Sequence, residues 1–183
     1  MAAPAEPDYL VPKHDDPWTV EDVLGLPEDH GSRIELVDGG LLVSPAPKSG
    51  HQRLLQRLQV GLVSALPDGT ELLPGVNVRL AGQRLLIPDF AIVTTPGLDV
   101  IYYQAQDLLL VAEIVSPSSR MLDRVLKRQL YAEAAVPFYL VVDPAGPAVL
   151  FELTDGEYRE SARSEGGKLA FTRPFIATLD LTR

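Results

Sequence analysis

Short apolar runs, separated by turn-forming residues, recur along this chain. Three are nearly continuous, at residues 85–93, 108–115 and 136–142. Runs of this length that are bounded by Pro, Gly or Asp are typical of β-strands buried on both faces. Residues 51–66 and 120–135 instead carry apolar residues three and four apart, which predicts helices. The pattern therefore predicts a mixed α/β (α+β) domain, in which helices flank a mixed central sheet.

Turn residues predict β-hairpins near both ends of this domain. Residues 33–43 hold two β-forming segments on either side of Asp38-Gly39-Gly40. An Asp-Gly turn between such segments is a strong hairpin signal. Residues 148–162 repeat the pattern around Asp155-Gly156, and 169–181 add two further short strands. In the first hairpin Glu35 stands between Ile34 and Leu36, a position typical of an outward polar residue on an alternating strand.

The remaining segments predict one domain preceded by a tail. Residues 1–17 contain four prolines and mixed charges, which favours a loose tail. Thr19 resembles the N-cap of a short helix that ends near Gly25. Since the chain has 183 residues and no internal repeat, we expect a single domain over residues 18–183.

Two of the buried strands each contain one carboxylate. Glu113 interrupts the apolar run 108–115, and Asp89 directly follows Pro88 in the run 85–93. A carboxylate inside a buried strand is costly unless it is protonated, paired or bound to a metal. A proline within a strand implies an edge, a bulge or a break, which can redirect the next side chain. The two strands could therefore direct oxygen ligands to one hard cation such as Mg²⁺. For Glu113, the alternative is a rim position at the open end of its strand.

Composition limits the class of protein. Hydrophobic residues make up 46% of the chain, enough for a full core, and cysteine is absent, which excludes disulfides and cysteine-bound zinc. The net charge of −9 argues against a general nucleic-acid coat protein. We find neither an apolar run long enough to span a bilayer nor a secretory signal, so we expect a cytoplasmic protein with no membrane partner.

The predicted helix 120–135 carries the cations closest in sequence to these strands. Asp123 and Lys127 are four residues apart and lie at the edge of a largely apolar face. That face is expected to consist of Leu122, Val125, Leu126, Gln129, Leu130 and Glu133. Arg120, Arg124 and Arg128 are expected on the solvent side, either binding nucleic acid or simply solvated. Near the start of the helix 51–66, His51 either binds a phosphate or caps the helix.

From residue 50 to 143 we expect a helix, a strand at 71–80, the strand 85–93, a loop at 94–107, the strand 108–115, a second helix and the strand 136–142. This order resembles the core of the PD-(D/E)xK nuclease superfamily, the restriction-endonuclease-like fold. In that pattern Pro88-Asp89 corresponds to the "PD" and Glu113 to the "(D/E)". The usual lysine would stand at Val115, which shares a strand face with Glu113. Lys127, from the adjacent helix, is the candidate replacement.

A longer set of motifs resembles the Uma-two family of bacterial restriction-endonuclease-like proteins over roughly residues 18–183. The resemblance implies the fold and a magnesium-dependent nuclease-type site, with the lysine displaced as it is here, but it supplies no substrate. The motifs are Glu35-Leu36-Val37-Asp38-Gly39, Ser44-Pro45-Ala46-Pro47 with His51-Gln52, Pro88-Asp89, Glu113–Ser119, Asp123 with Lys127 and Tyr131, Val136–Pro144 and Pro174-Phe175.

Our first hypothesis is a metal-dependent endonuclease that hydrolyses phosphodiester bonds in DNA. Asp89 and Glu113 would hold Mg²⁺ or Mn²⁺, and Glu35 would be a further ligand or support one. Lys127 would orient the attacking water or stabilise charge on the phosphate. Arg120, Arg124, Arg128 and His51 would contact the nucleic-acid backbone. The alternatives are a nuclease-like homodimer that binds nucleic acid or protein without cutting, and a structural homodimer with Glu113 and Lys127 as a buried ion pair.

Overall fold

The computed structural model describes residues 14–26, 32–116 and 122–182. Residues 1–13 of the predicted tail therefore lie outside the described residues. The helices and helical turns are α1 (Val20–Leu24), α2 (Ser49–Val63), η1 (Ala105–Asp107), η2 (Leu122–Lys127) and α3 (Arg128–Glu133). In the described part of the chain, no helix is long and apolar enough to cross a membrane.

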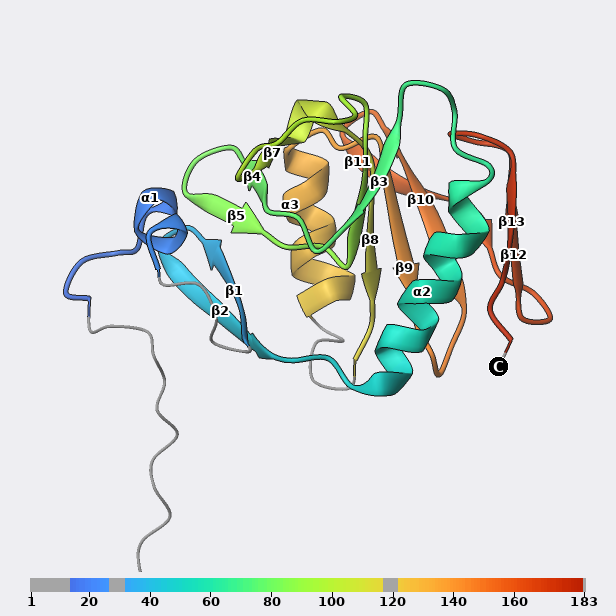
Figure 1. Cartoon of the computed structure of the whole chain (residues 1–183), viewed down its shortest axis with the longest axis horizontal. Coiled ribbons are helices and arrows are strands. Elements are labelled where there is room, and N and C mark those ends of the chain that lie inside the picture. The colour runs from blue at the N-terminus through green and yellow to red at the C-terminus, as the bar shows by residue number, and fades with distance from the viewer. Residues whose placement is uncertain (1–13, 27–31, 117–121, 183) are drawn as a thin grey trace, which may run out of the picture.

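A six-stranded mixed sheet forms the centre of the domain, as predicted (Figure 1). Its strands, in spatial order, are β11 (Glu157–Arg163), β10 (Ala148–Thr154), β9 (Phe138–Val142), β8 (Leu108–Ile114), β6 (Phe90–Val93) and β3 (Glu71–Pro74). The pair β8 and β9 is parallel and the other pairs are antiparallel. The strand that follows Asp89 (β6) and the strands that contain Glu113 (β8) and Phe138 (β9) therefore lie side by side.

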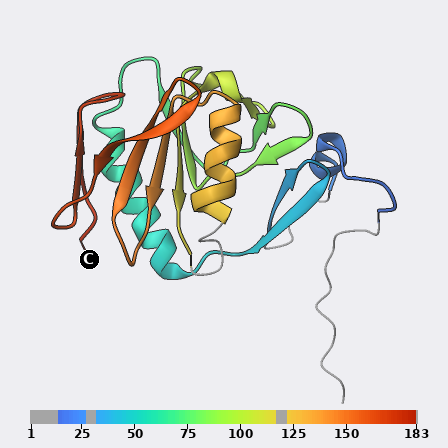
Figure 2. The same ribbon diagram turned by 180° about the vertical axis from the view of Figure 1, so that it is seen from behind.

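Helices cover opposite faces of this sheet. Leu54, Leu58 and Leu62 of α2 pack on alternate residues of β6, β8 and β9, together with the hairpin of β12 (Lys168–Phe171) and β13 (Ala177–Asp180). Leu130 and Tyr131 of α3 pack on the other face. Figure 2, turned by 180°, shows α3 in front of the strands, where Figure 1 shows α2. The segment η2–α3 is the crossover that a parallel pair such as β8 and β9 requires.

A second, five-stranded sheet lies beside the central one. Its order is β2 (Gly40–Pro45), β1 (Ser32–Val37), β5 (Arg84–Leu86), β4 (Val78–Leu80) and β7 (Tyr103–Gln104). The hairpin β1–β2 is the one predicted from the Asp-Gly turn, with Asp38 at φ 49° and Gly39 at φ 89°. Its inner surface packs against α1 through Val20, Val23 and Leu36.

Two strands predicted as continuous are divided between the two sheets. The run 85–93 becomes β5 and β6, separated by Ile87-Pro88-Asp89, because Pro88 has no N–H with which to continue the ladder. The run 71–80 becomes β3 and β4, separated at Pro74-Gly75, where Gly75 has φ 60°. The predicted loop 94–107 also differs, since it contains the short strand β7 and the turn η1.

The helix predicted over residues 120–135 begins, among described residues, with a π-helical segment. A π turn bonds residue i to i+5, so it rotates the early residues relative to those of α3. Val125 is consequently 63% exposed, and Gln129 and Glu133 are also exposed, although all three were expected on the buried face. Leu130 is buried as expected, and Lys127 and Tyr131 are buried in addition.

Candidate active site

Asp89 and Glu113 stand next to each other on neighbouring strands. Phe90 of β6 pairs with Ala112 of β8, and the antiparallel register continued by one residue brings Asp89 opposite Glu113. The backbone N–H of Asp89 donates to the carbonyl of Ala112 at 3.0 Å, and the N–H of Ile114 donates to Asp89 Oδ2 at 2.7 Å. Each carboxylate residue is only 2% exposed. The break at Pro88 thus brings a carboxylate to the side of β8, as its position in the sequence suggested.

Two basic side chains hold Asp89. Arg33 Nη1, from β1, lies 3.0 Å from Asp89 Oδ1, and His51 Nε2, from the first turn of α2, lies 3.1 Å from Oδ2. Burial acts to raise the pKa of Asp89, but the hydrogen bond with His51 and the charges of Arg33 and His51 outweigh it. The pKa therefore lies below its ordinary value, and Asp89 is a carboxylate at neutral pH.

Glu113 is held from the opposite face of the sheet. Lys127 Nζ lies 2.9 Å from Glu113 Oε1, and the hydroxyl of Tyr131 donates to the same oxygen at 3.1 Å. Lys127 is the last residue of η2 and Tyr131 lies one helical turn further on, so both point to β8 from one helix face. Burial and the charges of Glu113 and Glu35 raise the pKa of Tyr131 well above its ordinary value, so it remains a neutral donor.

Glu35 belongs to the same cluster. It is 1% exposed, and its Oε1 lies 2.9 Å from Lys127 Nζ and accepts the N–H of Ile87 at 2.7 Å. The expectation from alternation alone, an outward polar residue, is therefore wrong. Alternation places Glu35 on the face of β1 that is usually solvated. Here that face is turned inward, toward Ile87 and Lys127. Lys127 consequently bridges a carboxylate of each sheet.

The donor chemistry of this cluster suits a hard divalent cation. Asp89 and Glu113 offer carboxylate oxygens, and Mg²⁺ is bound in proteins by one or two carboxylates with waters and substrate phosphates. Within residues 14–26, 32–116 and 122–182, no three His, Cys, Asp or Glu side chains are grouped as a metal site. Asp89 and Glu113 are the residues that could hold such a cation, with waters or substrate oxygens as its other ligands.

Both a protein family and a solved structure resemble this chain. The model of the Uma2 family, described as "Putative restriction endonuclease", matches residues 20–182. The chain belongs to the Uma2 family. Among solved structures, the chain is similar to one described as a "putative nuclease belonging to DUF820" from Anabaena variabilis ATCC 29413. The TM-score is 0.66 at 15% identity, over 79% of this chain and 84% of that one, which shows a shared fold. The search of curated proteins found no match.

The other cations named from the sequence of this Uma2 chain do not join the cluster on the described contacts. Arg120 lies outside the described residues, as do the side chains of Asp123 and Arg124. Arg128 is half-buried and not on the solvent side: its guanidinium lies 4.2 Å from the ring centroid of Phe151 and donates to the carbonyl of Tyr158 at 2.6 Å. Those contacts fasten α3 to β10 and β11.

Two residues of the cluster received no role of their own in the sequence analysis. Arg33 was read only as part of the hairpin, although it is two residues before Glu35 and shares its strand face. Tyr131 entered only within a family motif, although it is four residues after Lys127 and shares its helix face. The spacing of Arg33 from Glu35, and of Tyr131 from Lys127, was therefore a signal in the sequence that could have identified them.

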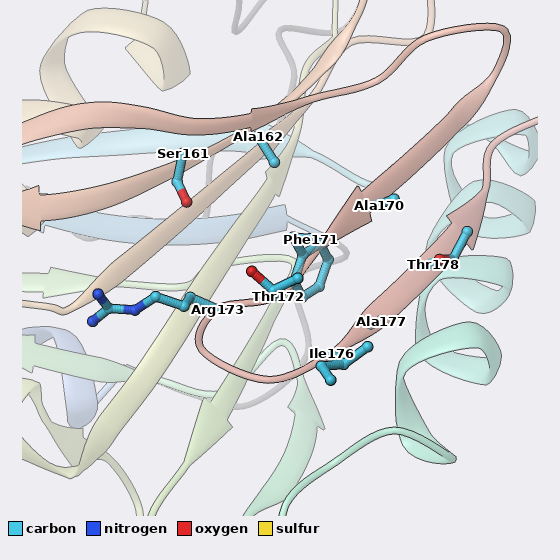
Figure 3. Close-up of a pocket in the computed structure, with 9 residues that line it drawn as sticks. All are labelled: Ser161, Ala162, Ala170, Phe171, Thr172, Arg173, Ile176, Ala177 and Thr178. Carbon is cyan, nitrogen blue, oxygen red and sulfur yellow. The ribbon is translucent and has the colours of Figure 1, made fainter.

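One pocket in the described part of this Uma2 protein lies away from Asp89 and Glu113. It opens between β11 and the hairpin β12–β13 and contains no carboxylate (Figure 3). Arg173 extends from it and pairs with Glu152 at 2.8 Å. None of the buried carboxylates Glu35, Asp89 and Glu113 lines this pocket. The lining residues are Ser161, Ala162, Ala170, Phe171, Thr172, Arg173, Ile176, Ala177 and Thr178.

Proposed function

We propose that this Uma2 protein is a Mg²⁺-dependent endonuclease that hydrolyses phosphodiester bonds in DNA. The observation that carries the proposal is the pairing of Asp89 and Glu113 across neighbouring strands, with the Lys127 ammonium 2.9 Å from Glu113. The Uma2 family is described as "Putative restriction endonuclease" and the similar Anabaena protein as a "putative nuclease", which supports this class of substrate. Manganese has the same preference for oxygen ligands and would substitute.

The arrangement supports a PD-(D/E)xK assignment with a displaced lysine. Pro88-Asp89 supplies the first acidic position and Glu113 the second. Val115, where the usual lysine would stand, is 2% exposed and packs in the apolar core. Lys127 brings an ammonium to Glu113 from the helix instead, so the same three chemical groups are present from a different part of the chain.

Asp89 and Glu113 would hold the metal ion, which when bound polarises a phosphoryl oxygen and lowers the pKa of a bound water. Lys127 would hold that water or offset the negative charge that develops on the phosphate. Tyr131 fixes the carboxyl group of Glu113 through its hydroxyl, and Arg33 and His51 fix that of Asp89. Burial of all three carboxylates strengthens these electrostatic effects by excluding water.

A second candidate is a nuclease-like homodimer that binds nucleic acid or protein without cutting. It is favoured by the bridge that Lys127 makes between Glu35 and Glu113. Such a buried ion network can hold the fold together without taking part in catalysis. The net charge of −9 favours its protein-binding form, because DNA is repelled at long range.

A cleavage assay separates the two functions. Plasmid DNA, single-stranded DNA and RNA are incubated with Mg²⁺ or Mn²⁺ and either the wild-type protein or Glu113→Gln, which keeps the side-chain shape. The matched control is Glu152→Gln, because Glu152 also pairs with a basic side chain, that of Arg173, but lies on β10 away from the site. Metal-dependent cleavage lost only in Glu113→Gln supports the endonuclease. Binding without cleavage by the wild-type protein supports the second candidate.

A further inference from the structure

The carboxylates of the acidic cluster are more deeply buried than the basic side chains that contact Asp89. Its carboxylates are the inner layer, since Glu35, Asp89 and Glu113 are 1–2% exposed. The side chains of Arg33 and His51, which contact Asp89, are 26% and 16% exposed. We call these two residues the basic rim. In a protein with net charge −9, a local positive layer over a negative site is what an approaching anion would meet first.

Arg33 has donors to spare. Its Nη1 pairs with Asp89 Oδ1, and among the residues that the structure describes it has no other hydrogen-bond partner. A guanidinium carries five N–H donors in a planar fork, which matches the oxygens of a phosphate. One contact with Asp89 therefore leaves most of the fork available while it fixes the direction in which the side chain points.

Arg33 also lies within the field of the whole cluster. Burial acts to lower the pKa of Arg33, but the charges of Asp89, Glu113 and Glu35 and the hydrogen bond to Asp89 raise it above its ordinary value. The charges of all three carboxylates therefore act on the guanidinium, which contacts Asp89 directly at 3.0 Å. A phosphate held by Arg33 would lie beside the group of residues that is proposed to act on it.

The other described cations near the site are less suited to this task. Lys127 is 3% exposed and is shared by Glu35 and Glu113. Arg128 is occupied by Tyr158 and Phe151. Arg57 donates to the backbone carbonyls of Arg53 and Thr182.

The basic rim also contains a ring nitrogen that has no hydrogen-bond partner among the described residues. His51 Nδ1 is buried, and no hydrogen-bond partner for it is present within the described structure. A buried ring nitrogen of this kind is normally satisfied by protein, water or ligand. Because Nε2 of the same ring contacts Asp89 Oδ2 and Arg33 contacts Oδ1, the two residues of the rim lie on the same carboxylate.

We propose that Arg33 binds the phosphate of the substrate, using the part of its guanidinium that Asp89 leaves unoccupied. The inference rests on the proposed function for the identity of the phosphate, a phosphodiester of DNA. Arg33 then has two tasks. It holds Asp89 in place before substrate arrives, and it anchors the phosphate next to Asp89 and Glu113 afterwards.

Phosphate binding without any metal tests this role directly. The melting temperature of the wild-type protein is measured in EDTA with increasing inorganic phosphate and, at equal ionic strength, chloride. A phosphate-specific increase is expected, since a ligand that binds only the native state stabilises it. Arg33→Gln should lose the increase. The matched control is Arg159→Ala, because Arg159 is a 65% exposed arginine that pairs with Asp155 at a distant hairpin.

DNA binding supplies a second readout. In EDTA, anisotropy of a labelled duplex over a series of salt concentrations should show Arg33→Gln binding about tenfold more weakly than wild type, on the scale of one charge-assisted hydrogen-bonded contact. The slope of log affinity against log salt should fall by about one. Arg159→Ala should leave both unchanged.

Arg33→Lys distinguishes substrate binding from mere pairing with Asp89. A lysine restores the positive charge beside Asp89 but not the planar fork. Recovery of the melting temperature without recovery of phosphate binding supports the proposal, and this variant also serves if Arg33→Gln does not fold. Full recovery of both, or no phosphate-specific effect in the wild-type protein, overturns it.

The outcome is independent of cleavage. If Arg33 variants keep wild-type phosphate and DNA binding while Glu113→Gln abolishes cleavage, the role of Arg33 is wrong and the proposed function stands. If the wild-type protein never cleaves but binds phosphate through Arg33, the proposed function fails and the anion site stands.

Discussion

Lys127 Nζ lies 2.9 Å from Glu113 Oε1 and 2.9 Å from Glu35 Oε1. The three residues come from a helix, a central strand and a strand of the second sheet, and each is at most 3% exposed. One ammonium therefore neutralises charge where the crossover helix and both sheets meet. Lys127, which was expected at the edge of the helix, is part of the interior.

Removal of Lys127 should be costly both to stability and to activity. Lys127→Met would leave Glu35 and Glu113 buried without their shared cation, a change that typically costs about 3–5 kcal/mol. A surface pair would cost at most about 0.5 kcal/mol. Urea unfolding of the purified variant distinguishes these values.

At a temperature where Lys127→Met remains folded by circular dichroism, cleavage should fall by about 10²-fold or more. Lys127→Arg should not restore it fully, because guanidinium is larger and planar. A folded variant with wild-type cleavage would contradict a catalytic role for Lys127 and leave only the structural one.

Binding of Mg²⁺ should stabilise the wild-type protein through Asp89 and Glu113. Millimolar Mg²⁺ or Mn²⁺ should raise its melting temperature, since the site exists only in the native state. Asp89→Asn and Glu113→Gln should remove most of the increase. The matched control is Asp107→Asn, because Asp107 accepts hydrogen bonds in a surface turn away from these residues. An increase of equal size in all four proteins would mean that the ion binds elsewhere.

The depressed pKa of Asp89 predicts a loss of stability in acid. A carboxyl group whose pKa is lower in the folded than in the unfolded protein stabilises the fold above its unfolded pKa. That contribution disappears as pH falls below about 4 and through the folded pKa. Urea midpoints between pH 6 and 2 should therefore fall less steeply for Asp89→Asn than for wild type.

Asp38→Asn is the control for this acid transition. The pKa of Asp38 is also lowered, first by its hydrogen bonds with Arg84, but the group is fully exposed. Its removal should change the acid slope little. If Asp38→Asn flattens the slope more than Asp89→Asn does, the buried carboxylate is not the main acid-sensitive group.

The π segment before α3 predicts which helix residues matter for stability. Val125→Ser should change the free energy of unfolding by less than about 0.5 kcal/mol, because Val125 is 63% exposed. Leu130→Ala should cost about 2–5 kcal/mol, because Leu130 is 3% exposed in the core. Similar losses of stability in both variants would instead support the uniform α-helical face expected from the sequence, with Val125 and Leu130 both buried.

The sequence by itself determined the secondary structure around the site and its first two candidate ligands. Glu113 and Asp89 could be recognised because each is a charged residue within an apolar run. That contrast is visible in the adjacent sequence and needs no knowledge of the tertiary structure. Lys127 also followed from the sequence, through its spacing on a helix and the absence of a lysine at position 115.

Only the tertiary structure decided which side chains complete the cluster. Arg33 and Glu35 lie on a hairpin whose alternation looks like that of any half-exposed strand, and the face turned inward depends on where the second sheet packs. His51 similarly meets Asp89 only because α2 crosses the end of β6. Periodicity along one segment specifies which residues share a face, but contact between segments depends on how their packed faces meet in three dimensions.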